Sequence, residues 1–218
     1  IEPRVRAEMD RGMRIYGNPS SFNDAGRAAA KELSVARLKV ARFLGAHPEE
    51  VVFTSSGSEA NNLAIQGAMN NERGIVITTP IEHPSVLEPI KQLEREGYKV
   101  RYLPVDRYGF VDPKSVQNML TAHCSLISVM YANNEIGTIE PINKIGKIIK
   151  EFRKGLEIRN SKLEIHGKLA KPIFHVDACQ AAGYLNMNVN SLGADLLTFN
   201  GSKMGGPRGI GVLYVRRG

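Results

Sequence analysis

The sequence has few cysteines and no long apolar run, and both absences exclude classes of protein. The two cysteines, Cys124 and Cys179, are too few for a disulfide framework, and no paired Cys/His spacing suggests a metal site. No apolar run approaches the roughly 18 residues of a membrane span, and the first twelve residues contain neither an apolar stretch nor a cleavage-like site. We therefore expect a cytoplasmic protein without a metal ion or a membrane partner.

Aromatic residues are also scarce, at 6% of the chain, and they do not interleave with the basic residues. Lys and Arg outnumber Asp and Glu by 29 to 22, and much of the surplus falls in 144–171 and at Arg216 and Arg217. A nucleic-acid surface would combine such charge with stacking side chains. We therefore interpret 144–171 as a solvated helix and loop, with a surface excursion at 155–171, and expect no direct nucleic-acid partner.

Strand and helix patterns alternate along the chain, which at 218 residues and 42% hydrophobic content can bury a substantial core. Helical patterns such as 26–45, 59–70, 84–97 and 141–154 separate short β-branched runs. These runs lie at 51–55, 75–79, 100–105, 126–132, 173–178, 195–200 and 210–215. The alternation predicts an α/β fold with a mostly parallel, mixed sheet, helices on both faces, and ligands at the carboxyl ends of the strands.

Three of the predicted strand ends carry polar residues that suit a binding site. The turn in 54–62 leads into a helix N-terminus, where free N–H groups favour a phosphate, although Ser58 as a plain helix cap is an alternative. His83 precedes Pro84 at the next strand end and has either a structural or a functional role. The amides of 133–137 follow a third strand, as part of a site or of an Asn-rich turn.

Asp177 and Lys203 follow two further predicted strands. A carboxylate directly after a buried strand is costly unless it meets a cation or a strong donor. Lys203, in the glycine-rich run 200–211, suits a phosphate clamp, a solvated loop, or an amine that bonds to a carbonyl compound. With the phosphate cradle and His83, the two residues match what pyridoxal phosphate (PLP) needs. The lysine forms a Schiff base, and the aspartate keeps the pyridine nitrogen protonated.

Six motifs in order carry a family resemblance: GNPSS, FTSSGSEANN, EHPSVL, YANNEIGTIEPI, FHVDACQAAG and SKMGGPRGIGVLYVRRG. Their order resembles the NifS/IscS-like cysteine desulfurases, together with the selenocysteine lyases of the same aminotransferase class V group. The resemblance implies that residues 1–218 form the large PLP-binding domain of fold type I. It also implies PLP as cofactor, L-cysteine as substrate, a homodimer, and an iron–sulfur scaffold or another sulfur-acceptor protein, including one of tRNA thiolation, as partner.

The same resemblance assigns roles to individual residues. Lys203 is the Schiff-base lysine, Asp177 pairs with the pyridine nitrogen, and His83 stacks on the ring and handles protons. The other implied positions contact the cofactor or border the pocket: Gln180 and Asn134 near the ring hydroxyl, Gly57 and Ser58 at the phosphate, and Asn18 in the GNPSS loop.

The chain departs from the family pattern around the lysine. Relatives carry Ser-Gly-His-Lys, whereas this sequence has Asn200 and Ser202 at the first and third positions. Both are polar, so the resemblance still implies that they contact the cofactor near its phosphate. A tyrosine of the family is Gly205 here, and a histidine is Asn23. These changes fit a divergent branch.

The family motifs that would flank this chain are not in its sequence. The family opens with Asp-Asn-Ala-Ala-Thr-Thr, and its C-terminal region holds a nucleophilic cysteine loop and a substrate-binding arginine. Cys179 adjoins Asp177 and is interpreted as a buried small residue rather than a substitute nucleophile. We therefore expect an incomplete large domain without the small domain. The alternatives are a PLP-binding or dimerising fragment, a selenocysteine lyase and a class V aminotransferase.

Overall fold

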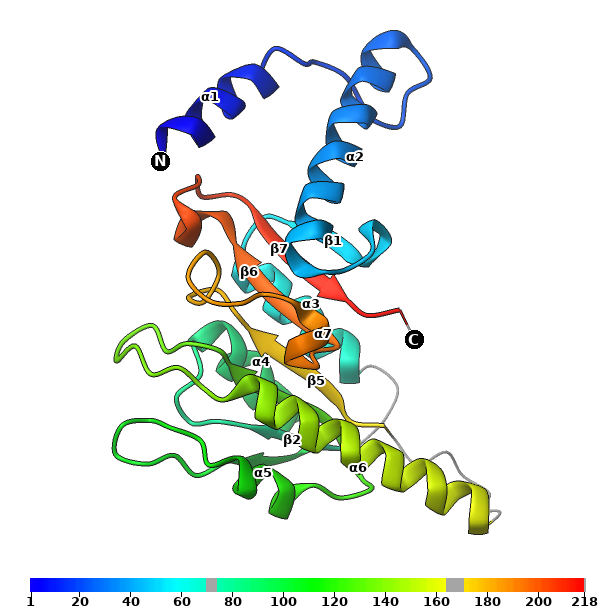
Figure 1. Cartoon of the computed structure of the whole chain (residues 1–218), viewed down its shortest axis with the longest axis vertical. Helices are drawn as coiled ribbons and strands as arrows, with labels where there is room; N and C mark the ends of the chain where they lie inside the picture. Colours follow the sequence, from blue (N-terminus) through cyan, green and yellow to red (C-terminus); the bar gives the residue numbers. More distant parts are fainter. Residues whose placement is uncertain (70–73, 164–170, 218) are drawn as a thin grey trace.

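The fold is built on one mixed sheet, shown in Figure 1. The computed structural model describes residues 1–69, 74–163 and 171–217. Within them the strand order is β1-β7-β6-β5-β4-β2-β3. The strands are β1 (Val51–Thr54), β2 (Ile75–Thr78), β3 (Lys99–Tyr102), β4 (Cys124–Met130), β5 (Ile173–Asp177), β6 (Leu196–Asn200) and β7 (Gly211–Val215). All seven predicted strands are confirmed.

The sheet is mostly parallel, as predicted. Strands β3, β2, β4, β5 and β6 run parallel, whereas β7 pairs antiparallel with both β6 and β1. The carboxyl ends of the parallel strands therefore meet at one edge of the sheet, the edge where α/β proteins bind their ligands. The predicted motif turns after β2, β4, β5 and β6 all lie at this edge.

Helices cover both faces of the sheet, which confirms the predicted fold class. They are α1 (Pro3–Gly12), α2 (Asp24–Leu44), α3 (Gly57–Met69), α4 (Pro84–Arg95), α5 (Pro113–Met119), α6 (Ile142–Leu163) and α7 (Val189–Leu192), with 3-10 turns η1 (Pro48–Glu50) and η2 (Gly201–Met204). Apolar residues of α3 and α4 form the core on one face. Those of α5, α6, α7 and the end of α2 form the larger core on the other face.

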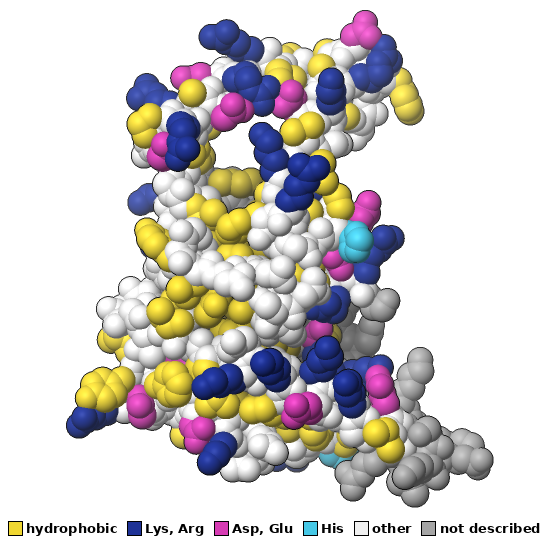
Figure 2. Space-filling view, viewed as in Figure 1, with side chains coloured by type: hydrophobic (Ala, Val, Ile, Leu, Met, Phe, Trp, Pro, Cys, Tyr) yellow, Lys and Arg dark blue, Asp and Glu magenta, His cyan; other side chains and the backbone are white. Residues whose placement is uncertain are grey.

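Helix α6 corrects the predicted excursion at 155–171. The helix continues to Leu163, because its apolar stripe reaches Leu156, which is 4% exposed, and no proline interrupts it. Residues 164–170 lie outside the described residues. Figure 2 shows Lys and Arg along this helix interspersed with Asp and Glu, and Lys144, Lys147 and Lys150 are exposed on it. This mixture matches the predicted solvated helix face.

Helices α1 and α2 extend beyond the body of the sheet. Figure 1 shows α2 reaching the sheet only with its C-terminal end, and only Gly26, Ala41 and Leu44 of its 21 residues are buried. Near the start of α1, the Glu2 N–H donates to the Gly205 carbonyl at 2.8 Å, beside the glycine-rich loop. Across the described part of the chain, no helix combines the length and apolarity needed to cross a membrane.

The α6–α7 contact gives a prediction for stability. Gly146 lies against α7, where an added Cβ would sit 2.1 Å from the Leu192 carbonyl oxygen. Gly146→Ala is therefore expected to lower the free energy of unfolding by about 1–3 kcal/mol, because backbone has to shift to make room. Urea unfolding of the two proteins measures the change.

Gly155→Ala is the matched control on the same helix. A Cβ at Gly155 meets nothing within 4 Å. Because alanine is the better helix former by about 0.5–1 kcal/mol, the control is expected to be stabilising. Equal destabilisation at both positions would contradict the close packing assigned to Gly146.

Candidate active site

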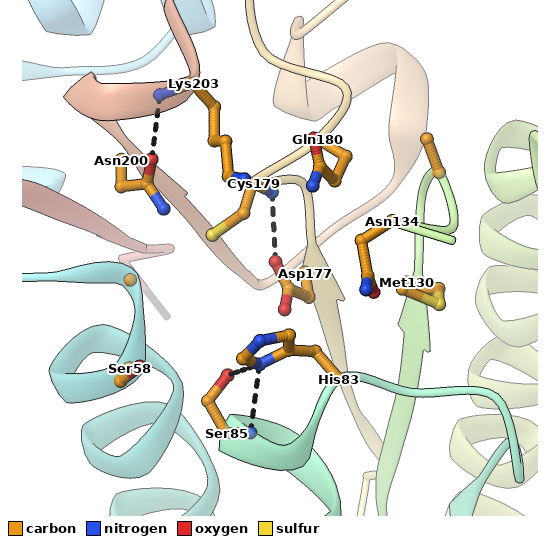
Figure 3. Close-up of a pocket in the computed structure, with 12 residues that line it drawn as sticks. Ser58, His83, Ser85, Met130, Asn134, Asp177, Cys179, Gln180, Asn200 and Lys203 are labelled. Atoms are coloured by element: carbon orange, nitrogen blue, oxygen red, sulfur yellow. Dashed lines mark hydrogen bonds between the residues drawn. The ribbon is translucent and has the colours of Figure 1, made fainter. Parts of the chain in front are cut away.

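A cavity of about 190 Å³ lies at the carboxyl edge of the sheet. Its walls come from the ends of β4, β5 and β6 and from the first turns of α3 and α4 (Figure 3). The lining residues are Gly57, Ser58, His83, Ser85, Met130, Ala132, Asn134, Asp177, Cys179, Gln180, Asn200 and Lys203. Eight of the ten sequence-predicted site residues therefore share one cavity.

Lys203 reaches the cavity from the short turn η2 that follows β6. Asn200 caps this turn, because its Oδ1 accepts from the Lys203 N–H at 3.2 Å. In Figure 3 the lysine side chain extends towards Cys179. Gly205 ends η2 at φ 76°, a left-handed conformation that favours glycine. The turn thus presents a primary amine at the edge of the cavity.

Asp177 closes β5 at the floor of the cavity and is 4% exposed. Its Oδ1 accepts from the Cys179 N–H at 2.9 Å, and its Oδ2 accepts from the Asn61 amide at 2.8 Å. Within the described residues Asp177 forms no salt bridge. The predicted strong donors are present, and the carboxylate has acceptor capacity left for a cationic group in the cavity.

Beneath Asp177, a neutral histidine supports the floor. His175 lies two residues earlier on the same strand, between the Ser128 hydroxyl at 2.8 Å and the Thr198 hydroxyl at 3.2 Å. Burial lowers the pKa of His175 to about 4. At neutral pH it therefore acts as a hydrogen-bonding spacer between neighbouring strands and carries no charge.

His83 is the N-cap of α4, directly before Pro84, as the sequence suggested. Its Nδ1 accepts from the Ser85 N–H at 3.1 Å and lies 2.8 Å from the Ser85 hydroxyl. The ring lies between Ser85 and Asp177 in Figure 3. Because Nδ1 is an acceptor, the proton of the neutral ring is on Nε2. The structural role of His83 as a helix cap is therefore confirmed, and its ring also lines the cavity, while its functional role stays a prediction.

The first turn of α3 forms another wall. Ser56 caps this helix, since its Oγ accepts from the Glu59 N–H at 3.1 Å, so the alternative that Ser58 is the cap is wrong. Gly57 and Ser58 occupy the first two helical positions, whose N–H groups have no acceptor within the helix. A Cβ on Gly57 would come within 2.7 Å of the Cys179 Sγ. This wall can accept an anion, and a larger residue at Gly57 would have to displace the Cys179 side chain.

The two asparagines after β4, Asn133 and Asn134, differ in position: one forms a turn and the other lines the cavity. Asn133 forms the turn, because its Oδ1 accepts from the N–H groups of Glu135 and Ile136 at 2.8 and 3.0 Å. Asn134 lines the cavity, as does Gln180 after β5. A turn residue and a cavity residue therefore stand side by side.

Asn18 and Ser202 are not among the residues that line the cavity. The Ser202 hydroxyl donates to the Asn200 side chain at 3.0 Å and supports the η2 turn. Asn18 lies between α1 and α2, where its Oδ1 accepts from the Ser20 N–H at 2.9 Å. That loop adjoins the end of α2 that projects from the body. The position of Asn18 beside the pocket stays a prediction.

Cys179 lines the cavity but is not an activated nucleophile. Burial raises the pKa of its thiol well above the usual range, and the nearby Asp177 carboxylate adds to this shift. The thiolate is the nucleophilic form of cysteine, so a raised pKa leaves the group inert. The prediction that Cys179 is not a substitute nucleophile fits this pKa, but the prediction that it is buried is wrong, because the residue is partly exposed on the cavity wall.

Asn61 and Ser85 are supporting residues that the sequence interpretation missed. The Asn61 amide donates to Asp177 and, at 2.9 Å, to the Ser85 hydroxyl. Asn61 lies on the buried face of α3 with Ala60, Ala64 and Ile65. A polar residue on the apolar face of a predicted helix was the signal that could have identified it.

Glu82, beside His83, gives a prediction for pH dependence. It is 4% exposed, and its Oε1 accepts from Thr79 and from the Met130 N–H, both at 2.8 Å. Its Oε2 has no hydrogen-bond partner among the residues that the structure describes. Burial raises the pKa of Glu82 from 4.5 to about 8. Because the folded state binds the proton more tightly, the contribution of Glu82 to stability is fully present below about pH 4.5 and is lost as pH rises to about 8.

Glu82→Gln is expected to remove most of the loss of stability that Glu82 causes as the pH rises. At pH 8.5 the variant should exceed the parent protein in free energy of unfolding by on the order of a few kcal/mol, with a much smaller difference at pH 5. Urea unfolding at both pH values measures this. The control is Glu88→Gln at an exposed position of α4. A difference independent of pH would show that Glu82 is ionised in the folded protein.

Comparison with known proteins places the chain among the class V aminotransferases and their relatives. It is 44% identical over 206 residues to the cysteine desulfurase IscS of Dictyoglomus turgidum and 44% identical over 205 residues to a cysteine desulfurase of Nostoc sp.. Each match covers 93% of this chain and 48% and 47% of the relative, respectively. The chain thus spans about half the length of these curated relatives.

Solved structures agree in fold with this chain. A NifS-like protein superposes with a TM-score of 0.87 at 35% identity, covering 100% of this chain and 56% of its own. The structure described as SspA in complex with cysteine also superposes with a TM-score of 0.87, at 34% identity. This match covers 99% of the present chain and 58% of the SspA chain. The aminotransferase class-V family matches residues 2–218. The chain therefore belongs to the aminotransferase class-V family.

Proposed function

We propose that this chain carries the PLP site of a cysteine desulfurase, which converts L-cysteine to L-alanine and passes the sulfur to a thiol. The observation that carries the proposal is the meeting of the Lys203 amine and the Asp177 carboxylate in one cavity. The cysteine desulfurases among its relatives support the choice of reaction. The NifS-like neighbour and the neighbour solved with cysteine support it further.

The residues of the cavity fit PLP in three respects. Asp177 is buried and unpaired by any cation of the described residues, so it suits the protonated nitrogen of a pyridine ring. The turn at Gly57, which a Cβ would obstruct, leaves helical N–H groups for a phosphate. Lys203 supplies an amine that can bond to an aldehyde.

The proposed roles of the other residues follow from these three anchors. Gly57 and Ser58 hold the phosphate, together with Asn200 at the end of β6 and Ser202 on the η2 turn that follows it. Asn134 and Gln180 contact the side of the ring that bears its hydroxyl. His83 stacks on the ring and exchanges hydrogen bonds through Nε2, because Nδ1 is occupied by Ser85.

When bound, PLP supplies an electron sink that makes the substituents of an attached amino acid labile. Asp177 keeps the ring nitrogen protonated, and Lys203 holds the cofactor and moves the proton at the substrate α-carbon. An acceptor thiolate would attack the sulfur of cysteine, so that a sulfur–sulfur bond forms as the carbon–sulfur bond breaks and leaves its electron pair on carbon. The β-carbon would then gain a proton and Lys203 would return the proton to the α-carbon, which gives alanine. Burial raises the pKa of the Cys179 thiol, and Cys124 is fully buried away from the cavity, so we assign the acceptor to a thiol other than these two.

The experiment is to incubate the protein with PLP, L-cysteine and a thiol reductant, and to measure alanine and sulfide. Equal amounts of the two products are expected when an acceptor thiol is present. Pyruvate instead of alanine would show lyase chemistry of another kind, and amino-group transfer to a keto acid would favour an aminotransferase. A protein that never takes up PLP would end the proposal. The homodimer, the sulfur-acceptor partner and a cytoplasmic location stay predictions of the family resemblance.

A further inference from the structure

A buried amide links the two sides of the cavity. Asn61, on α3, is 0% exposed. Its Nδ2 donates to Asp177 Oδ2 at 2.8 Å and to the Ser85 Oγ at 2.9 Å. Asp177 belongs to the floor, and Ser85 belongs to the turn that carries His83. One side chain therefore contacts both groups, although they are far apart in the sequence.

The chemistry of Asp177 determines which group donates and which accepts at each hydrogen bond of this link. An amide nitrogen has two hydrogens, and Asn61 uses both. A carboxylate only accepts, so the nitrogen, not the oxygen, must face Asp177. The Ser85 oxygen accepts from Asn61, so its own hydrogen is free to donate to His83 Nδ1 at 2.8 Å. The Ser85 N–H donates to the same Nδ1 at 3.1 Å. Asn61 thus favours the His83 form with its proton on Nε2.

The amide is kept at a cost to stability. The Oδ1 of Asn61 is buried without a hydrogen-bond partner within the described residues. An unpaired buried acceptor is unfavourable, and leucine would fill a similar volume without that penalty. Packing alone therefore does not account for asparagine on this face of α3.

We propose that Asn61 is a positioning residue, which orients the Asp177 carboxylate and, through the Ser85 hydroxyl, strengthens the hydrogen bonding of His83 Nδ1 as an acceptor. The inference rests on the proposed function, because Asp177 is the group taken to face the pyridine nitrogen. Asn61 touches neither cofactor nor substrate in this scheme. Asn61 holds the Asp177 carboxylate at one end of a hydrogen-bond chain and the His83 imidazole at the other end.

The first test compares binding of PLP with binding of an analogue that has carbon in place of the ring nitrogen. The parent protein is expected to prefer PLP, and Asn61→Leu to reduce this preference by about 10-fold, because a hydrogen bond to a charged group is lost. Asn62→Leu makes the same change at the next residue and should keep the preference, because the Asn62 amide donates to the Ser58 carbonyl at 2.9 Å and has no bond to Asp177 or Ser85 among the described contacts.

The outcomes separate this inference from the proposed function. If the parent protein binds neither compound, the PLP proposal fails. If the parent prefers PLP and Asn61→Leu prefers it equally, the positioning role of Asn61 is refuted while the PLP site stands.

The second test covers the possibility that Asn61→Leu does not fold. Ser85→Ala breaks the link to His83 but leaves the Asn61 bond to Asp177. The Ser85 N–H, which donates to His83 Nδ1 at 3.1 Å, remains in this variant, and only the hydroxyl donor at 2.8 Å is lost. Nitrogen-15 NMR of the histidine ring is therefore expected to show the Nε2-protonated form in both proteins, with the Nδ1 resonance of Ser85→Ala shifted towards that of an acceptor nitrogen with weaker hydrogen bonding. The preference for PLP over the analogue should stay unchanged in this variant, because the Asn61 bond to Asp177 remains. An Nδ1 resonance identical in the two proteins would refute the proposed chain.

Discussion

Replacing Lys203 by alanine is expected to abolish covalent attachment of PLP and to slow exchange of the amino-acid α-hydrogen by about 10³-fold or more. The lysine enters the cavity from η2, where Asn200 fixes its backbone. Removal of its amine leaves only non-covalent contacts, so the cofactor should be lost on dialysis. Visible absorbance after dialysis measures retention, and exchange of the L-alanine α-hydrogen in deuterated water measures chemistry without any sulfur acceptor.

Lys144→Ala is the control, since Lys144 lies on the exposed face of α6. It should retain PLP as the parent protein does. Full retention of cofactor absorbance by Lys203→Ala would mean that another amine holds the cofactor, and the assignment of Lys203 would be wrong.

Asp177→Asn is expected to leave a bound but weakly activated cofactor. The amide keeps the shape of the carboxylate, and its oxygen can still accept from the Cys179 N–H, but the negative charge is lost. That charge is what keeps a pyridine nitrogen protonated in a buried site. Exchange of the substrate α-hydrogen should fall by about 10²–10³-fold, in the range found when one electrostatic stabiliser is removed from an active site.

The matched control for this change is Asp112→Asn. Asp112 caps α5, and asparagine caps helices about equally well, so the same replacement should leave exchange unchanged there. If Asp177→Asn exchanged the α-hydrogen at the parental rate, its charge would have no part in activating the cofactor.

The sequence predicted the parts of the site that depend on sheet topology. Asp177 and Lys203 lie at the carboxyl ends of two successive strands, β5 and β6. Because these strands are parallel, both side chains lie at the same edge of the sheet. His83 was predicted at the same edge because Pro84 marks a helix start directly after a strand. Such positions follow from short-range signals that a single sequence contains.

Features that depend on side-chain packing were not predictable in this way. Ser56 rather than Ser58 caps α3, a shift of two residues that hydroxyl-rich turns leave open. The link through Asn61 spans residues 61 to 177, and no local pattern reports such a distant contact. Helix α6 extends beyond its predicted end because Leu156 is buried by tertiary contacts, which override weak periodicity.

Lys203 is expected to bind PLP covalently at this cavity. Borohydride reduction of the PLP-loaded protein, followed by proteolysis and mass spectrometry of the peptides, measures this attachment. We expect one reduced pyridoxyl group per chain, on the peptide that contains Lys203, and none after Lys203→Ala. A stable adduct on a different lysine, or none at all on a protein saturated with PLP, would show that Lys203 is not the attachment site.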